Sequence, residues 1–411
     1  MRDGRAWRVV RLGDHCAKIG SGATPRGGEA VYQERGVALI RSQNVYNGQF
    51  AMDGLAHLDE EHADQLNGVT VKSGDVLLNI TGDSVARSCR VSEEVLPARV
   101  NQHVAIIRPK PAEFDSRFVG YYLISPFMQD TMLSLARSGG TRNALTKQMI
   151  ERFEVPRPPR PVQVRIADIL SAYDDLIENN RRRMALLEEA ARQLYREWFV
   201  RLRFPGHQHT PITNGLPKGW QRIHLADACR TQYGYTETAT TEPVGPRFLR
   251  GMDINKTDFI DWSTVPYCEI DEPNQRKYHL RIGDIVVIRM ADPGKVGIVE
   301  RDIDAVFASY LIRLEITNSR VAPYYLYYVL SDYEYQQFVS GAGAGSTRKT
   351  ASAPLLVDFY FLLPTKPILR AFGLRIGPLR KQITTLLIQN EKLRAARDLL
   401  LPRLMNGEVG L

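Results

Sequence analysis

The chain has 411 residues, of which 44% are hydrophobic and 9% aromatic, and it carries a net charge of +8 at pH 7. It is longer than the roughly 250 to 300 residues at which a single core stops growing, so we expect at least two packed domains rather than a disordered chain. The four cysteines lie far apart, without the spacing of a zinc site or the density of a disulfide scaffold. No apolar run is long enough to cross a membrane, and no apolar signal segment follows the N-terminus. We therefore expect a cytoplasmic protein with an anionic partner, nucleic acid before membrane.

The sequence repeats itself once along its length. Four residues return with a constant offset of 213: Trp7, Leu12, Asp14 and Cys16 match Trp220, Leu225, Asp227 and Cys229. Further on, the offset drifts to 206, where Gly139, Thr141 and Arg142 match Gly345, Thr347 and Arg348. This period is far longer than the roughly 20 to 50 residues of a solenoid repeat, so it indicates the tandem duplication of a whole domain.

Short apolar runs bounded by Gly, Asp, Asn and Pro predict strands of a mixed α/β domain in each repeat. The runs are residues 37–40, 76–80 and 104–107 in the first repeat, and 247–249, 285–288 and 311–314 in the second. A tyrosine-rich stretch that predicts a helix follows in each, at 118–136 and 324–339. A loop with glycine and threonine comes next, and then a strand-like exit at 153–156 and 359–361.

Past each exit the apolar spacing changes from about two to about three and a half residues, which predicts a long helix with a heptad seam. In the first helix, steps of three and four alternate except at Asn180, where two fours meet, so we expect one stutter there. Its seam is Ile166, Ile169, Tyr173, Leu176, Asn180, Met184, Leu187, Ala191, Leu194 and Trp198. The second seam is Phe372, Ile376, Leu379, Ile383, Leu386, Asn390, Leu393, Arg397, Leu400 and Leu404.

Each seam runs for about 35 residues, roughly 50 Å, which is longer than a small mixed domain can cover. The two helices are therefore expected to bury their seams against each other as an antiparallel coiled coil. Asn180 and Asn390 lie on the seams and are expected to set the register, because a buried amide is costly unless it meets a partner. Gly373 and Gly377 weaken the start of the second helix, so we expect its first turns to be bent or frayed.

One glycine-rich stretch, residues 341–349 with the sequence GAGAGSTRK, resembles a phosphate-binding loop. A dinucleotide fingerprint needs a preceding strand, and a P-loop needs Lys followed by Ser or Thr at a fixed distance from its glycines. Here a helix is predicted before the loop and the glycine spacing is wrong. Its counterpart at 138–143 shares only Gly-x-Thr-Arg, in which small residues let backbone amides approach a phosphate and the Arg supplies charge. A tight turn explains the glycines equally well.

Charge is segregated along the chain. Residues 133–165 hold seven basic and two acidic residues, whereas residues 45–66 hold five acidic and no basic ones. This distribution is typical of a protein with one nucleic-acid face, although solvated charge on flanking helices explains part of it. No segment for a flipped adenine, methyl-donor loop, nuclease carboxylate pair or His-x-x-x-His metal spacing occurs. We therefore expect a binding protein without a catalytic or metal site.

The whole chain resembles the specificity subunit of type I restriction-modification systems. The resemblance rests on residues 20–25 followed by Tyr32, on 233–236 followed by 248–250, on 165–170 with Asp174, and on the ending 397–405 with Gly407 and Glu408. It implies a target-recognition domain at 1–158, a central helical spacer at 159–204, a second target-recognition domain at 205–364 and a C-terminal helical spacer at 365–411.

This resemblance also implies a function. Each target-recognition domain would read one half of a bipartite, asymmetric double-stranded DNA site, and the helical pair would set the spacing and dock two methyltransferase (modification) subunits. The chain itself would be non-catalytic and hold no cofactor, whereas S-adenosylmethionine, ATP and magnesium would bind on the modification subunits and on restriction or motor subunits. Two alternatives remain: a protein–protein scaffold, and a modification enzyme with unrecognised catalytic motifs.

Reading bases in the major groove needs Arg, Lys, Asn, Gln, Ser or Thr on loops that a rigid scaffold holds. We expect positions that repeat to grip phosphate, since that task is common to both halves, and positions that differ to read bases. The candidates in the first domain are Arg41, Gln43, Asn44, Arg87, Arg137, Thr141, Arg142 and Asn143. In the second domain they are Arg250, Asn255, Arg289, Lys295, Ser346, Thr347, Arg348 and Lys349.

Overall fold

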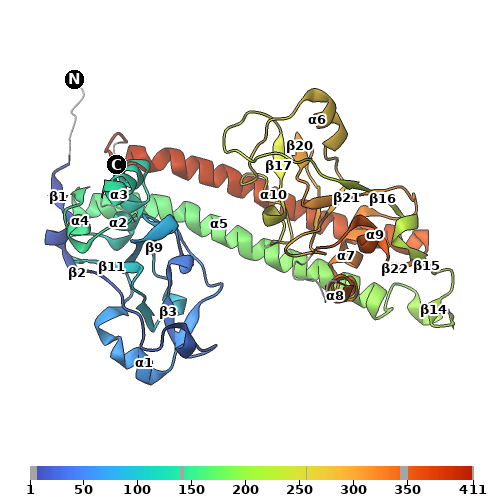
Figure 1. Cartoon of the computed structure of the whole chain (residues 1–411), viewed down its shortest axis with the longest axis horizontal. Helices are drawn as coiled ribbons and strands as arrows, with labels where there is room; N and C mark the ends of the chain where they lie inside the picture. Colours follow the sequence, from blue (N-terminus) through green and yellow to red (C-terminus); the bar gives the residue numbers. More distant parts are fainter. Residues whose placement is uncertain (1–6, 139–142, 256, 343–349, 410–411) are drawn as a thin grey trace. The chain divides into compact units, whose positions relative to one another are not determined.

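The computed structural model describes residues 7–138, 143–255, 257–342 and 350–409, and it is a mixed α/β structure, as predicted. The chain divides into two compact units (Figure 1). Unit 1 comprises Met1–Ile177 with Lys392–Leu411, and unit 2 comprises Glu178–Glu391. Both long helices, α5 (Arg160–Tyr195) and α10 (Lys366–Met405), contribute to each unit. Among the described residues, no helix has the length and hydropathy that a membrane span requires.

Unit 1 is built around two four-stranded sheets, of which β2, β11, β9 and β3 are labelled in Figure 1. The antiparallel sheet has the order β2 (Cys16–Ser21), β11 (Val104–Pro109), β8 (Val76–Asn79) and β9 (Ser88–Arg90). The second sheet has the order β6 (Ala56–Leu58), β3 (Val37–Ile40), β10 (Ala98–Val100) and β7 (Thr70–Val71), with β3 and β10 parallel. Two strand pairs are β1 (Val9–Arg11) with β12 (Glu154–Pro156) and β4 (Val45–Tyr46) with β5 (Gln49–Phe50). The helices are α1 (Glu60–Gln65), α2 (Ser116–Leu123), α3 (Pro126–Ser138) and α4 (Lys147–Glu151).

Unit 2 repeats the antiparallel sheet, the parallel strand pair and the β1–β12 pair of unit 1, so the repeat in sequence is a repeat in structure. Its antiparallel sheet has the order β16 (Cys229–Tyr233), β21 (Leu311–Ile316), β18 (Ile285–Ile288) and β19 (Val296–Ile298). The parallel pair is β17 (Arg247–Leu249) with β20 (Ala305–Phe307). The antiparallel pairs are β15 (Gln221–His224) with β22 (Tyr360–Leu363) and β13 (Ile212–Thr213) with β14 (Leu216–Pro217). The helices are α6 (Glu272–Tyr278), α7 (Pro323–Ser331), α8 (Tyr333–Ala342) and α9 (Ala353–Val357).

The predicted tyrosine-rich helix is two helices in each repeat. In unit 1 the chain breaks between α2 and α3 just before Pro126, because proline cannot donate the backbone hydrogen bond that would continue α2. In unit 2 it breaks between α7 and α8 at Asp332, whose backbone is extended. In each repeat the apolar residues of the two successive helices recur at the same helical spacing. The sequence therefore predicts one helix where the structure has two.

Two equivalent glycines explain part of the opening motif of each domain. A Cβ atom at Gly22 would lie 1.9 Å from the carbonyl oxygen of Val100, and one at Gly234 would lie 2.2 Å from that of Ala308. Val100 is the last residue of β10, and Ala308 directly follows β20. Each of these strands belongs to the parallel pair of its unit. Only glycine allows this approach of backbone to backbone.

The two long helices run antiparallel where they pack together, as predicted. Within unit 2, Asn180 of α5 donates a hydrogen bond from Nδ2 to Oδ1 of Asn390 on α10, at 2.9 Å. Eight residues further along α5, Glu188 bonds Arg380, ten residues earlier on α10. Within unit 1, Oδ1 of Asp174 on α5 lies 2.5 Å from Nη1 of Arg397 on α10. The amide pair joins equivalent positions of the two repeats, 210 residues apart.

The stutter predicted at Asn180 is wrong. The side chain of Leu176 is 51% exposed, whereas that of Ile177 is 4% exposed and takes the seam position. Leu170 is fully buried, whereas Ile169 is only partly buried, so Leu170 takes the place predicted for Ile169. The seam then runs through Ile166, Leu170, Tyr173, Ile177 and Asn180 in alternating steps of four and three, and no stutter falls at Asn180. Leucine and isoleucine are adjacent here, so hydrophobicity alone could not choose between them.

The second helix does not fray at its glycines. α10 is continuous from Lys366, through both Gly373 and Gly377. Ile376, between the two glycines, is fully buried in the core of unit 2. Phe372, just before Gly373, is 1% exposed in the same core. Tertiary packing therefore overrides the weak helix propensity of glycine.

Candidate nucleic-acid interface

The loops that carry most candidates in unit 1 are tied together at one end of its sheets. Asn79 N donates to Arg87 O at 2.8 Å, and Ile80 N donates to His103 O at 3.0 Å. Asn101 N donates to Ile40 O at 3.0 Å, and Leu145 N to Ile80 O at 2.8 Å. These bonds join the loops after β3 and β8 to the loop before β11 and to the segment before α4. We call residues 41–44, 79–87, 101–103 and 143–145 loop cluster 1.

Unit 2 repeats all four of these hydrogen bonds. Ile288 N donates to Lys295 O at 2.8 Å and Arg289 N to Tyr310 O at 3.0 Å. Ala308 N donates to Leu249 O at 2.9 Å and Ala351 N to Arg289 O at 2.7 Å. Residues 250–255, 288–295, 308–310 and 350–351 form loop cluster 2. The shared bonds define which residues are equivalent, and they pair Arg87 with Lys295.

Arg41 is held by its own loop in cluster 1. Its Nη2 donates to Gly54 O at 2.7 Å, and its guanidinium lies 5.1 Å from the centre of the Tyr32 ring. Gln43 donates to the same carbonyl group from Nε2 at 3.0 Å. Both side chains are thus preorganised near the surface, with Gln43 partly exposed. An ordered arginine loses less conformational entropy when it grips a phosphate.

Asn44 supports this loop and does not face solvent. Its side chain is fully buried. Oδ1 accepts a hydrogen bond from Arg41 N at 3.0 Å, and Nδ2 donates to Ala51 O at 3.0 Å. In this conformation Asn44 cannot present a donor to DNA, so its place among the direct contacts is corrected to that of a residue that positions Arg41.

The other candidates of unit 1 are at the surface. The guanidinium of Arg87 lies 5.0 Å from the centre of the Tyr46 ring. Arg137, in the last turn of α3, and Asn143 are exposed. The predictions for Thr141 and Arg142 lie outside the described residues.

Unit 2 repeats the arginine motif with a charged partner. Arg250 N donates to Oδ2 of Asp253 at 2.8 Å, and Arg250 Nη2 lies 2.9 Å from Asp253 Oδ1. The guanidinium of Arg289 lies 5.0 Å from the centre of the Tyr233 ring, and Lys295 is exposed. The buried Oδ1 of Asn255 accepts no hydrogen bond within the described part of the chain. The predictions for Ser346, Thr347, Arg348 and Lys349 lie outside the described residues.

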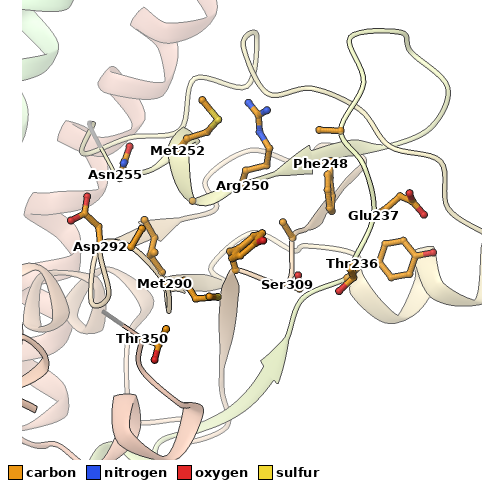
Figure 2. Close-up of a pocket in the computed structure, with 17 residues that line it drawn as sticks. Thr236, Glu237, Phe248, Arg250, Met252, Asn255, Met290, Asp292, Ser309 and Thr350 are labelled. Carbon is orange, nitrogen blue, oxygen red and sulfur yellow. The ribbon is translucent and has the colours of Figure 1, made fainter. Parts of the chain in front are cut away.

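Loop cluster 2 also surrounds a cavity of about 830 Å³ that sequence reasoning missed. Figure 2 shows the lining side chains, which come from separate loops and strand ends and surround one space. Apolar groups dominate the lining, among them Phe248, Met252, Ile288, Met290 and Tyr310. Two carboxylates, Glu237 and Asp292, also line it, and such groups accept hydrogen bonds from the amino groups of bases. The signal in the sequence was weak, because apolar residues beside strands read as core.

A second feature that the sequence did not reveal is a buried ion network in unit 2. The fully buried Arg380 on α10 donates to Glu188 Oε2 of α5 at 2.5 Å and to both carboxylate oxygens of Glu300, at 2.8 and 2.5 Å. Tyr328 Oη donates to Glu188 Oε2 at 3.1 Å. Burial raises the pKa of Glu188, although Arg380 and Arg192 oppose the shift. The network fastens the loop after β19, and with it the sheet that carries cluster 2, to both helices.

No group of three or more His, Cys, Asp or Glu side chains is placed to hold a metal ion within the described part of the chain. Burial raises the pKa of Cys89 and Cys229 to about 12, so both thiols stay protonated at neutral pH. What the loops offer is hydrogen-bonding, cationic and apolar surface.

Comparisons with known proteins agree with this description. Residues 5–189 match the family model described as type I restriction modification DNA specificity domain. The MjaIX specificity subunit of a type I restriction enzyme from Methanocaldococcus jannaschii is 24% identical, with 98% of this chain and 93% of that protein covered. The HindI specificity subunit from Haemophilus influenzae is 20% identical, with 91% and 94% covered. The crystal structure of the type I restriction-modification S subunit from M. genitalium shares the fold, with a TM-score of 0.57, 14% identity and coverage of 98% and 97%.

Proposed function

Because the chain belongs to the family of type I restriction-modification specificity subunits, we propose that loop clusters 1 and 2 each read one half of a bipartite, asymmetric DNA site. The observation that carries the proposal is the set of four equivalent backbone hydrogen bonds that builds the same platform twice. The side chains on the two platforms differ. A duplicated scaffold with diverged loops suits the recognition of two similar but non-identical duplex segments.

The repeated basic residues are the proposed phosphate contacts. Arg41 and Arg250 occupy equivalent positions, and so do Arg87 and Lys295. Phosphate geometry is the same in both half-sites, so these positions keep their charge while their neighbours change. Sequence would then be read by the positions at which the clusters differ.

The helical pair is the proposed spacer and docking surface. α5 and α10 would fix the number of unread base pairs between the half-sites and bind two modification subunits. Leucines on the outer helix faces, such as Leu176, Leu186 and Leu399, are exposed and offer apolar contacts to such partners. S-adenosylmethionine would bind on the modification subunits, with ATP and magnesium on restriction or motor subunits, and this chain would hold no cofactor.

Salt-dependent DNA binding by the full chain tests the phosphate contacts. Arg87→Ala and Lys295→Ala each remove one cation, so each should weaken binding to all duplexes and reduce the slope of log K against log salt by about 1. Lys218→Ala, which removes an exposed cation from the turn between β14 and β15, is the matched control and should leave the slope unchanged. Unchanged slopes in both cluster variants would instead favour a scaffold that binds protein.

A methylation assay separates recognition from catalysis. The full chain alone, incubated with DNA and S-adenosylmethionine, should transfer no methyl group. Adenine methylation should appear only after modification subunits are added. Transfer by the chain alone would show that it is a modification enzyme.

A further inference from the structure

The two loop clusters differ in polarity at equivalent positions. Cluster 1 has Gln43, Asn79, Thr81 and His103 where cluster 2 has Met252, Ile288, Met290 and Tyr310. The first pair lies two residues after the equivalent arginines Arg41 and Arg250. The equivalence of Thr81 and Met290 follows from two matching isolated β-bridges, one between Thr81 and Ala144 and one between Met290 and Thr350. On the same backbone, two methionines and a tyrosine thus replace polar residues at the surface, and Ile288 replaces the buried Asn79.

Thr81, Gln102 and His103 of cluster 1 form a hydrogen-bonding surface, whereas Asn79 is fully buried. Thr81 Oγ1 lies 2.7 Å from His103 Nδ1, and Gln102 Nε2 lies 3.0 Å from His103 Nε2. Such groups discriminate bases through donors and acceptors on the base edges. Cluster 2 has no equivalent of this network in its described residues, because methionine and tyrosine occupy those positions.

Two of these residues of cluster 2, Met252 and Tyr310, are open to solvent, whereas Ile288 is buried. Met252 is 64% exposed and Tyr310 is 56% exposed, and both line the cavity with Met290. Figure 2 places Met252 and Met290 on separate loops around the same space. An exposed apolar surface on one side of a loop platform indicates a partner with an apolar group of its own.

A free acceptor lies in the same cavity. Asn255 lines it, and the buried Oδ1 of Asn255 accepts no hydrogen bond from the described residues. A buried acceptor without a donor costs about 1 to 3 kcal/mol, so a donor from a ligand would be favourable at this atom once the groups that cover it move. An asparagine side chain can bond the N6 and N7 edge of adenine with both of its polar atoms.

We propose that cluster 2 reads an A·T base pair, with the thymine 5-methyl group packed on Met252, Met290 and Tyr310 and the adenine amino group donating to Asn255. In the major groove the methyl group is the feature that only thymine carries, and it meets apolar side chains. Cluster 1 would read its half-site through hydrogen bonds and would not depend on a methyl group. This inference rests on the proposed function and adds the base class of the second half-site.

Selection from two randomised duplex libraries tests the proposal with the full chain. One library contains thymine and the other contains uracil, which pairs identically but lacks the 5-methyl group. The thymine library should yield a bipartite site. The uracil library should keep one half and lose positions in the other, with a loss of about fourfold in affinity for each contacted methyl group. Two complete half-sites from the uracil library would overturn the inference while leaving the proposed function intact, whereas no enriched site from either library would refute the proposed function.

Variants assign the methyl-dependent half to cluster 2. The double substitution Met252→Gln with Met290→Thr installs the residues of cluster 1 and should abolish the preference for thymine over uracil. Ile282→Gln is the matched control, because Ile282 is as exposed as Met252. It precedes the N-terminal end of β18, whereas cluster 2 lies at the C-terminal end, so this variant should preserve the preference for thymine. Asn255→Leu should weaken selection of the adenine at the same base pair. If the double variant folds, as judged by its thermal unfolding, and still prefers thymine, the assignment to cluster 2 is wrong.

Discussion

Replacement of Arg380 by methionine should destabilise unit 2 more than any surface charge change. The arginine side chain is fully buried and makes three hydrogen bonds to carboxylates, one to Glu188 and two to Glu300. In Arg380→Met, Glu188 keeps Arg192 and Tyr328 as partners. Glu300 loses both of its bonds to Arg380. Breaking a buried ion pair in this way typically costs about 3 to 5 kcal/mol, because a buried charge remains without its partner.

The cost should fall when the stranded carboxylates are neutralised. Arg380→Met combined with Glu188→Gln and Glu300→Gln removes the charges together, and replacing a whole buried ion network is often close to neutral. We therefore expect the triple variant to recover at least half of the stability that the single variant loses.

Urea unfolding measures these differences. Trp198, Trp220 and Trp262 all lie in the cores of unit 2, so tryptophan fluorescence reports chiefly on this unit. The matched control is Arg230→Met, which breaks a surface pair with Glu315 and should cost less than about 1 kcal/mol. The reasoning is refuted if Arg380→Met costs no more than Arg230→Met, or if the triple variant is less stable than the single one.

Three further predictions concern the helices and unit 1. Asn180→Leu should cost about 1 to 3 kcal/mol because Oδ1 of Asn390 loses its donor from Asn180, and adding Asn390→Leu should recover that loss in urea unfolding; equal effects of the single and double variants would argue against the pairing. Burial raises the pKa of Asp115, but hydrogen bonds from Arg117 and Arg160 outweigh it and hold the pKa below 3.8. The ionised carboxylate of Asp115 therefore stabilises the fold above pH 3.8, and this contribution is lost as pH falls through the lower folded pKa. The free energy of unfolding of Asp115→Asn should consequently depend less on pH in acid than that of the unmodified protein, and an unchanged pH dependence would contradict this. Gly373→Ala should stabilise α10 by up to about 1 kcal/mol, because an added Cβ meets no atom within 4 Å, and a lower melting temperature would count against it.

The sequence predicts the strands and the long helices well because their signals are local. Residues 37–40, 247–249 and 285–288 are strands as predicted, since each is a short apolar run bounded by turn residues. The two asparagines on the seams meet, as expected from the helical period and the cost of a buried amide. The duplication supplied a second, independent copy of each local signal.

Features that depend on packing between distant segments could not be predicted. Arg380 reads as a solvated arginine on a helix, and its burial follows only from the approach of Glu188 and Glu300 from elsewhere in the chain. Asn44 reads as a polar loop residue until Arg41 and Ala51 are seen to use its hydrogen bonds. The cavity of cluster 2 has the same origin, because its lining comes from five stretches of sequence.

The identification of two separate readers is tested most directly by exchanging one of them. Residues 205–364 would be replaced by the equivalent segment of a relative with a different target, and the hybrid would be expressed with modification subunits. Methylated adenines would then be mapped across the genome of the host. We predict that one half of the bipartite site changes while the other half and the spacing between them stay the same. A change in both halves, or in the spacing alone, would contradict the assignment of one half-site to each loop cluster.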